Sequence, residues 1–239
     1  MNALVNHIAF GWYPYLCLIV FLLGSLLRFD REQYTWKTGS SQLLRHRQLM
    51  WGSNLFHIGI LIIFIGHLVG LLTPIWMFEM IGVTHSFKQG LAIGVGGVAG
   101  LVMLVGLLLL THRRLTDARI RRNSSFGDIA VLLLLLAQLL LGLATIRISL
   151  DHMDGGEMLK FMSWAQGIMT LQPNVSDLVA DASPVFKAHL LLGMTLFLIF
   201  PFTRLVHVWS APVWYLGRRS YQIVRINRKA ARVPMQPAE

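Results

Sequence analysis

The stretch QLMWGSNLFHIGILIIFIGHLVGLLTPIWMF, residues 48–78, contains no Asp, Glu, Lys or Arg. About 20 consecutive apolar residues are enough for an α-helix to cross the hydrocarbon core of a bilayer. We therefore expect residues 52–72 to form a membrane-spanning helix. The same stretch holds His57 and His67, and ionisable side chains inside a membrane are costly and usually functional.

Four further apolar segments are candidates for spanning helices: residues 13–27, 90–111, 129–146 and 186–210. The last contains Pro201, which removes a backbone hydrogen bond, so we expect a kink there in a helix that continues to Ser210. The composition agrees, with 55% hydrophobic and only 13% charged residues and a mean hydropathy of +0.59. The sequence predicts an all-α integral membrane protein in which residues 1–225 form a five-helix transmembrane domain and residues 226–239 a basic tail.

The positive charges are distributed unevenly among the connections. Seventeen of the 21 Lys and Arg residues fall in three segments, residues 28–47, 112–126 and 204–239. The positive-inside rule then places these segments in the cytoplasm, the N-terminus in the periplasm and the C-terminus inside. The formal net charge of +10 raised nucleic-acid binding as an alternative, but the five apolar spans exclude it.

Two local features carry weaker expectations. In the outer connection, residues 148–185, the segment 157–169 around Trp164 predicts either a short helix lying on the membrane surface or a plain loop. Glycines recur at four-residue spacing, which favours close helix packing and also makes room for a flat cofactor. These pairs are Gly66 and Gly70, Gly90 and Gly94, and Gly96 and Gly100.

The chain contains a single cysteine, Cys17. It cannot form an intrachain disulfide, covalent haem attachment through a C-x-x-C-H motif is absent, and a thiolate-held iron–sulfur cluster would need several cysteines. Any haem is therefore expected to be held without a covalent link.

Four histidines lie within or at the edge of two expected spans: His57 and His67, and His189 and His207. Imidazole is a good ligand for iron. Because the two spans run in opposite directions, His67 and His189 should share the outer level of the membrane and His57 and His207 the inner level. The sequence therefore predicts two haems, each held between one histidine from each helix. The alternative is four hydrogen-bonded core histidines.

Ideal helix geometry fits these pairs only in part. His57 and His67 are about 15 Å apart along a helix, whereas His189 and His207 would be about 27 Å apart. We expect helix tilt, the kink at Pro201 and tilted haem planes to absorb the difference.

Two basic residues are candidates for supporting roles. Arg204 lies three residues before His207 and could pair with a propionate of the inner haem, or could be a cytoplasmic Arg extending toward water. Lys88 lies on the outer side and could donate a hydrogen bond to a quinone oxygen, or could be an interfacial anchor.

Several motifs resemble the gamma subunit of respiratory nitrate reductases. They are SNLFHIGI at 53–60 with Gly66-His67, LRFD at 27–30 with QYTW at 33–36, LTPIWM at 72–77, HMDG at 152–155 with WAQ at 164–166, and HLLLGMTLF at 189–197 with PFTRLVH at 201–207. The resemblance covers nearly the whole chain.

The resemblance implies a di-haem cytochrome b of the bacterial inner membrane. The family's haem ligands fall on His57 and His207 for the inner haem and on His67 and His189 for the outer haem. A family lysine implicated in quinol binding falls on Lys88, and a family glycine near the quinol site falls on Gly70. The implied partners are an iron–sulfur beta subunit and a molybdenum-containing alpha subunit at the cytoplasmic face.

We therefore expect a quinol-oxidising subunit of a nitrate reductase, taking electrons from menaquinol or ubiquinol and releasing protons outside. Electrons would pass through the two haems b to the beta subunit, and nitrate would be reduced on another subunit. One alternative is a related quinone-linked cytochrome of a sulfur or heterodisulfide reductase. The other is a membrane anchor without a cofactor.

Overall fold

The computed structural model describes residues 2–36, 41, 43–210 and 217. The chain divides into two units, and the first, Met1–His207, contains all the long helices of the described chain. The expected tail, residues 226–239, lies outside the described residues. The described residues form helices joined by loops, without a strand.

Five helical segments of the described chain are long and apolar enough to cross a membrane, as predicted: Ala3–Arg31, His46–Leu72, His85–Thr116, Phe126–Leu150 and Pro184–Phe202. The first comprises α1 (Ala3–His7), a π-helical turn (Ile8–Trp12) and α2 (Tyr13–Arg31). The next three are α3 (His46–Leu72), α5 (His85–Thr116) and α7 (Phe126–Leu150). The last begins with α9 (Pro184–Ile199). The chain is a multi-pass membrane protein.

Polar caps mark where three of these helices begin. The Thr84 hydroxyl accepts from the backbone N–H of Phe87 at the start of α5. Ser125 and Asp128 form a reciprocal capping box at the start of α7. The Ser183 hydroxyl accepts from Val185 before α9. Each cap satisfies backbone donors that the first turn of a helix leaves free.

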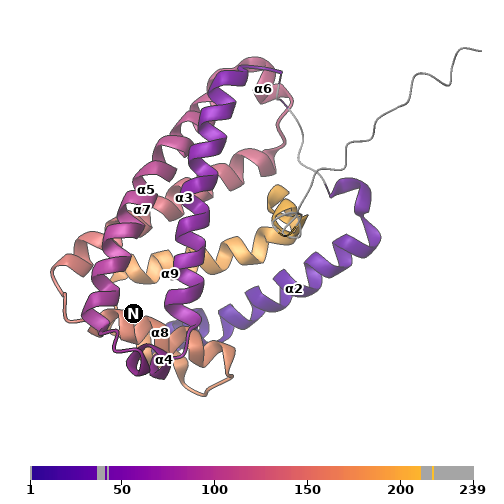
Figure 1. The fold of residues 1–239 in the computed structure, drawn as a ribbon. Helices are drawn as coiled ribbons and strands as arrows, with labels where there is room; N and C mark the ends of the chain where they lie inside the picture. The colour runs from indigo at the N-terminus through magenta and orange to yellow at the C-terminus, as the bar shows by residue number, and fades with distance from the viewer. Residues whose placement is uncertain (1, 37–40, 42, 211–216, 218–239) are drawn as a thin grey trace, which may run out of the picture. The chain divides into compact units, whose positions relative to one another are not determined.

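Helices α3 and α5 pack side by side (Figure 1). Two glycines allow this approach. A Cβ at Gly59 would lie 2.6 Å from the Ala99 carbonyl oxygen, and a Cβ at Gly106 would lie 2.8 Å from the Gly52 carbonyl oxygen. Each glycine therefore lets the backbone of the other helix approach closely, as small residues permit between membrane helices.

The four-residue glycine pairs were a misleading guide to this packing. A Cβ at Gly66, Gly70, Gly90, Gly94 or Gly96 would meet nothing within 4 Å. Gly90 and Gly94 instead line an apolar groove between α3 and α5 with a volume of about 600 Å³. Of the six glycines, Gly100 approaches a neighbouring helix closely, at Leu143 of α7. Spacing alone does not tell which face of a helix is covered.

The last span departs from the expected kinked helix. α9 ends at Ile199, a short 3-10 turn covers Phe200–Phe202, Thr203 is extended (φ −122°, ψ 177°), and a second 3-10 segment covers Arg204–Ser210. Pro201 has no N–H to continue the helix. α2 supports the break: Arg28 Nη1 donates to the carbonyls of Pro201 (2.6 Å) and Thr203 (3.0 Å), which the break leaves without helical partners.

The outer connection contains the helix that the sequence allowed, α8 (Gly156–Met169), and a 3-10 turn at Val175–Val179. The apolar face of α8 is buried within the protein, in a cluster with Phe10 and Val175. Trp164 Nε1 donates to the Phe10 carbonyl (2.9 Å), and Gln166 Nε2 donates to the Leu71 and Thr73 carbonyls (3.0 and 2.9 Å). The connection thus ties the start of the chain to the end of α3.

We predict that Gly106→Ala destabilises the protein by about 1–3 kcal/mol, because the added methyl group forces α3 and α5 apart. Thermal unfolding of the detergent-purified protein measures the effect. Gly94→Ala on the same helix is the matched control, since its Cβ meets nothing within 4 Å. An equal loss of stability in both variants would contradict the close packing at Gly106.

Candidate functional site: two histidine pairs

Four imidazoles face one another in two pairs across the bundle. The rings of His57 (α3) and His207 (the 3-10 segment after α9) have centroids 6.4 Å apart, and those of His67 (α3) and His189 (α9) have centroids 6.2 Å apart. These are the two pairs that the helix directions predicted. The break at Ile199 removes the difficulty with axial distance, because His207 no longer belongs to the helix that carries His189.

Three of the rings are oriented in the same way by their own backbone. Nδ1 lies 2.7 Å from the Ser53 carbonyl oxygen in His57, 2.8 Å from that of Ile63 in His67, and 2.6 Å from that of Arg204 in His207. A carbonyl oxygen only accepts, so Nδ1 carries the proton in each ring. The Nε2 lone pair of each is left available as a ligand, in the arrangement typical of metal-binding histidines.

The spacing of the pairs fits one kind of ligand. An imidazole nitrogen binds a metal at about 2 Å, and its ring centre lies about 1.2 Å behind it, so two axial imidazoles have centroids about 6.3 Å apart. Among the described residues no three His, Cys, Asp or Glu side chains gather as a metal site. Two imidazoles alone fill too few positions around a free ion, but they suffice where a porphyrin supplies the rest. The residues present therefore fit haem.

The fourth ring, His189, has a different environment. Its Nδ1 is buried without a hydrogen-bond partner among the described residues. The side-chain amide of Gln138 on α7 lies beside the ring, with its nitrogen 3.5 Å from Nε2. The sequence analysis missed Gln138, although it is the one polar side chain within the apolar run IAVLLLLLAQLLLGLA, residues 129–144, and that interruption was the signal.

Lys88 is buried at the start of α5, with 7% of its surface exposed. Its ammonium donates to the Met162 sulfur of α8 (2.8 Å) and lies 3.6 Å from the centre of the Phe78 ring. No acidic side chain of the described residues forms an ion pair with it. A buried cation with such weak partners is costly, so an oxygen acceptor brought by a ligand would be favoured there.

Gly70 and Arg204 are the remaining two predicted site residues. Above Gly70 on α3 there is open space, since a Cβ would meet nothing within 4 Å. The hydrogen bond and the ring contact of Lys88 join it to Met162 and Phe78, and to neither Gly70 nor His67. Arg204 Nη1 lies 3.6 Å from Asp128 Oδ1, and Arg114 Nη1 lies 3.5 Å from the other carboxylate oxygen, Oδ2. The Arg204 guanidinium therefore has a partner on α7, and its propionate role stays a prediction.

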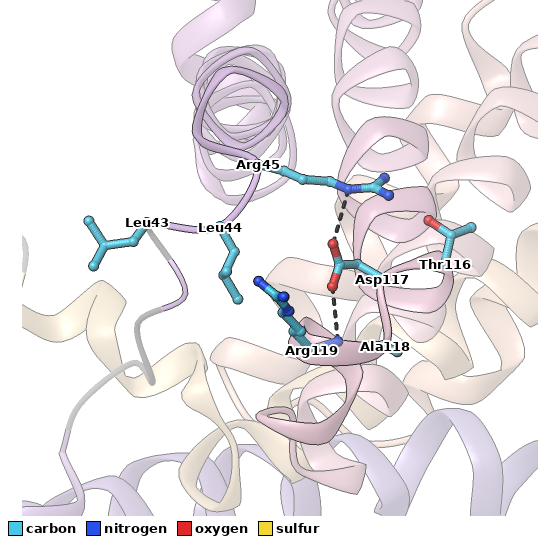
Figure 2. A pocket seen from close by; sticks show the side chains of 7 residues that line it. All are labelled: Leu43, Leu44, Arg45, Thr116, Asp117, Ala118 and Arg119. Carbon is cyan, nitrogen blue, oxygen red and sulfur yellow. Dashed lines mark hydrogen bonds and ion pairs between the residues drawn. The ribbon is translucent and has the colours of Figure 1, made fainter.

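A polar pocket of about 450 Å³ lies apart from the histidines, between the chain before α3 and the turn after α5 (Figure 2). Arg45 Nε lies 3.0 Å from Asp117 Oδ2, and Asp117 Oδ1 accepts from the backbone N–H of Arg119 (2.9 Å) and Ile120 (3.2 Å). The Ile120 N–H above all holds the pKa of Asp117 below its usual value. These bonds fix two connections to each other, and none of the predicted site residues lines the pocket.

Fold and site together define a class: a five-span helical membrane protein with two cross-bundle histidine pairs. The model of the nitrate reductase gamma subunit family matches residues 6–227. The chain belongs to this family.

Three nitrate reductase gamma chains match over nearly their whole length. The respiratory nitrate reductase 2 gamma chain of Escherichia coli (strain K12) is 50% identical over 94% of this chain and 98% of its own. The respiratory nitrate reductase 1 gamma chain of the same strain is 48% identical over 92% and 97%. The nitrate reductase gamma chain of Bacillus subtilis (strain 168) is 38% identical over 92% and 98%.

We predict that His67→Ala and His57→Ala each reduce the haem content of the purified protein from two to about one per chain, because each removes one axial ligand of one pair. Haem extraction against protein concentration measures this. His112→Ala serves as the control, since His112 lies outside both pairs and should leave the content unchanged. A full haem complement in either pair variant would refute the ligand assignment.

Proposed function

We propose that this chain is the di-haem cytochrome b subunit that oxidises quinol for a respiratory nitrate reductase. The observation that carries the proposal is the spacing of the two imidazole pairs, which suits axial ligation in both cases. Family membership supports it, because the relatives are named as gamma chains of nitrate reductases. The sulfur or heterodisulfide alternative has no such support, and a membrane anchor would not need two matched histidine pairs.

The four histidines would bind haem at two levels of the bundle. His67 and His189 would hold the outer haem b, and His57 and His207 the inner haem b. Haem iron supplies one-electron transfer, which the two-electron oxidation of a quinol needs twice. The protein's part is to fix the rings: Ser53, Ile63 and Arg204 hold three of them through Nδ1 and so present Nε2 in a fixed direction.

Lys88 would bind the quinol. Its ammonium is a hydrogen-bond donor whose only described polar partner is a thioether, a weak acceptor, so a quinol oxygen would be a better one. Gly70 would leave room for the quinol ring, since open space lies above it. Protons released at the outer level would leave to the periplasm without crossing the membrane.

Charge distribution supports a direction of electron transfer. If the basic connections lie inside, as the positive-inside rule predicts, the His57–His207 pair lies toward the cytoplasm. We propose that an iron–sulfur beta subunit receives the electrons there and passes them to a molybdenum-containing alpha subunit that reduces nitrate. The chain would then be located in the bacterial inner membrane with its N-terminus in the periplasm and its C-terminus in the cytoplasm.

An optical spectrum of the purified membrane complex, oxidised and then treated with quinol, tests the proposal. We expect b-type bands equivalent to two haems per chain that are reduced by quinol and reoxidised by nitrate. A complex without haem would overturn the proposal. Haems reoxidised by a sulfur substrate but not by nitrate would replace the nitrate reductase with the sulfur alternative.

We predict that Lys88→Ala retains both haems but lowers kcat/KM for quinol about 10- to 100-fold, because a hydrogen bond from a charged donor contributes about 1.5–3 kcal/mol. Steady-state quinol oxidation by the complex measures this. Lys160→Ala is the matched control: its ammonium lies 3.0 Å from Glu157 and 2.8 Å from Asp181 in partly exposed ion pairs, which contribute little. Unchanged quinol kinetics in Lys88→Ala would count against its role.

A further inference from the structure

We infer that Gln138 is a positioning residue for His189: its amide hydrogen-bonds the imidazole and so sets the orientation and basicity of this axial ligand. The inference rests on the proposed function, because it takes His189 as a haem ligand.

The side chains of α7 and α9 interlock at this point. Gln138 and Gly142 lie one turn apart on α7, and His189 and Gly193 lie one turn apart on α9. A Cβ at Gly193 would lie 3.2 Å from the Gln138 amide nitrogen, and a Cβ at Gly142 would lie 3.0 Å from His189 Cε1. Each side chain therefore fills the space over the glycine of the opposite helix.

The amide is anchored to the residue that it positions. Gln138 Nε2 donates to the His189 backbone carbonyl (3.2 Å) and lies 3.5 Å from the ring Nε2. Through the described part of the chain, the ring has no hydrogen-bond partner besides this amide. The other three rings bond to a carbonyl three or four residues earlier in their own segments, and His189 makes no such bond there.

Two complementary groups are left unsatisfied at this contact. Gln138 Oε1 and His189 Nδ1 are both buried without a partner among the described residues. An iron-bound imidazole keeps one N–H, and burying it unpaired is costly. In the haem-bound protein, a rotation of the amide or of the ring about its terminal bond would pair the oxygen with that N–H.

Such a bond changes a measurable property of the ligand. An acceptor on the second ring nitrogen raises the basicity of a metal-binding imidazole. A more basic ligand favours ferric over ferrous iron, so Gln138 lowers the midpoint potential of the outer haem. A side chain that only filled space would not act in this way.

Redox titration of the intact complex, followed by the optical bands of both haems, tests the inference. The outer haem is identified as the one lost in His67→Ala. Gln138→Leu should shift its potential to a more positive value, while the inner haem keeps its own. Gln138→Glu keeps an acceptor oxygen, so the potential should return to or fall below the wild-type value.

Gly193→Ala gives a second measurement with Gln138 in place. The added methyl group at position 193 displaces the Gln138 amide, so we expect the midpoint potential of the outer haem to shift to a more positive value, as in Gln138→Leu. Gly96→Ala on α5, where a Cβ meets nothing within 4 Å, is the matched control and should move neither potential.

The outcomes separate this inference from the proposed function. A wild-type complex without haem overturns the proposed function. A wild-type complex with two haems, whose outer potential is the same in Gln138→Leu and Gln138→Glu, overturns the inference alone. Loss of the outer haem in Gln138→Leu with recovery in Gln138→Glu supports the inference. If Gln138→Leu and Gln138→Glu both lose the outer haem, Gly193→Ala decides. A positive shift of the outer-haem potential in Gly193→Ala supports the inference, and an unchanged potential overturns the inference.

Discussion

The two histidine pairs can form together because α9 ends at Ile199. Ten residues separate the two histidines of α3, but eighteen separate their partners, and one straight helix would place those partners about 27 Å apart. Because Pro201 ends the helix and Thr203 is extended, His207 approaches from a separate 3-10 segment. Arg28 satisfies the carbonyls of Pro201 and Thr203, so α2 stabilises a break that would otherwise leave polar groups unpaired in an apolar environment.

The rest of the bundle holds α3 opposite this broken span. α3 packs on α5 through the backbone contacts at Gly59 and Gly106, α5 packs on α7, and α7 packs on α9. The α7–α9 contact does more than hold two helices together, because Gln138 and His189 meet in it. The packing that builds the bundle therefore also determines the surroundings of the His189 ring.

Much of the arrangement was predictable because it rests on local rules. Five apolar runs gave five spans, since length and apolar content alone decide whether a helix can cross a bilayer. The antiparallel order of α3 and α9 gave the pairing of His57 with His207 and of His67 with His189. The continuous last helix was predicted wrongly, because a proline in a membrane helix can either kink it or end it. Arg28, which is distant in sequence, hydrogen-bonds the carbonyls at the break, and no local pattern reveals this contact.

Hydropathy and chain direction are properties of the chain alone, and they were enough to predict the fold class, the number of spans and the pairs in which the four histidine rings lie. The packing of the helices, by contrast, sets which glycines are covered, where α9 ends, that Lys88 is buried against Phe78 and Met162, and that Gln138 lies on His189. These depend on how each helix is rotated about its own axis. That rotation is set by contacts between segments tens of residues apart, which no local pattern records.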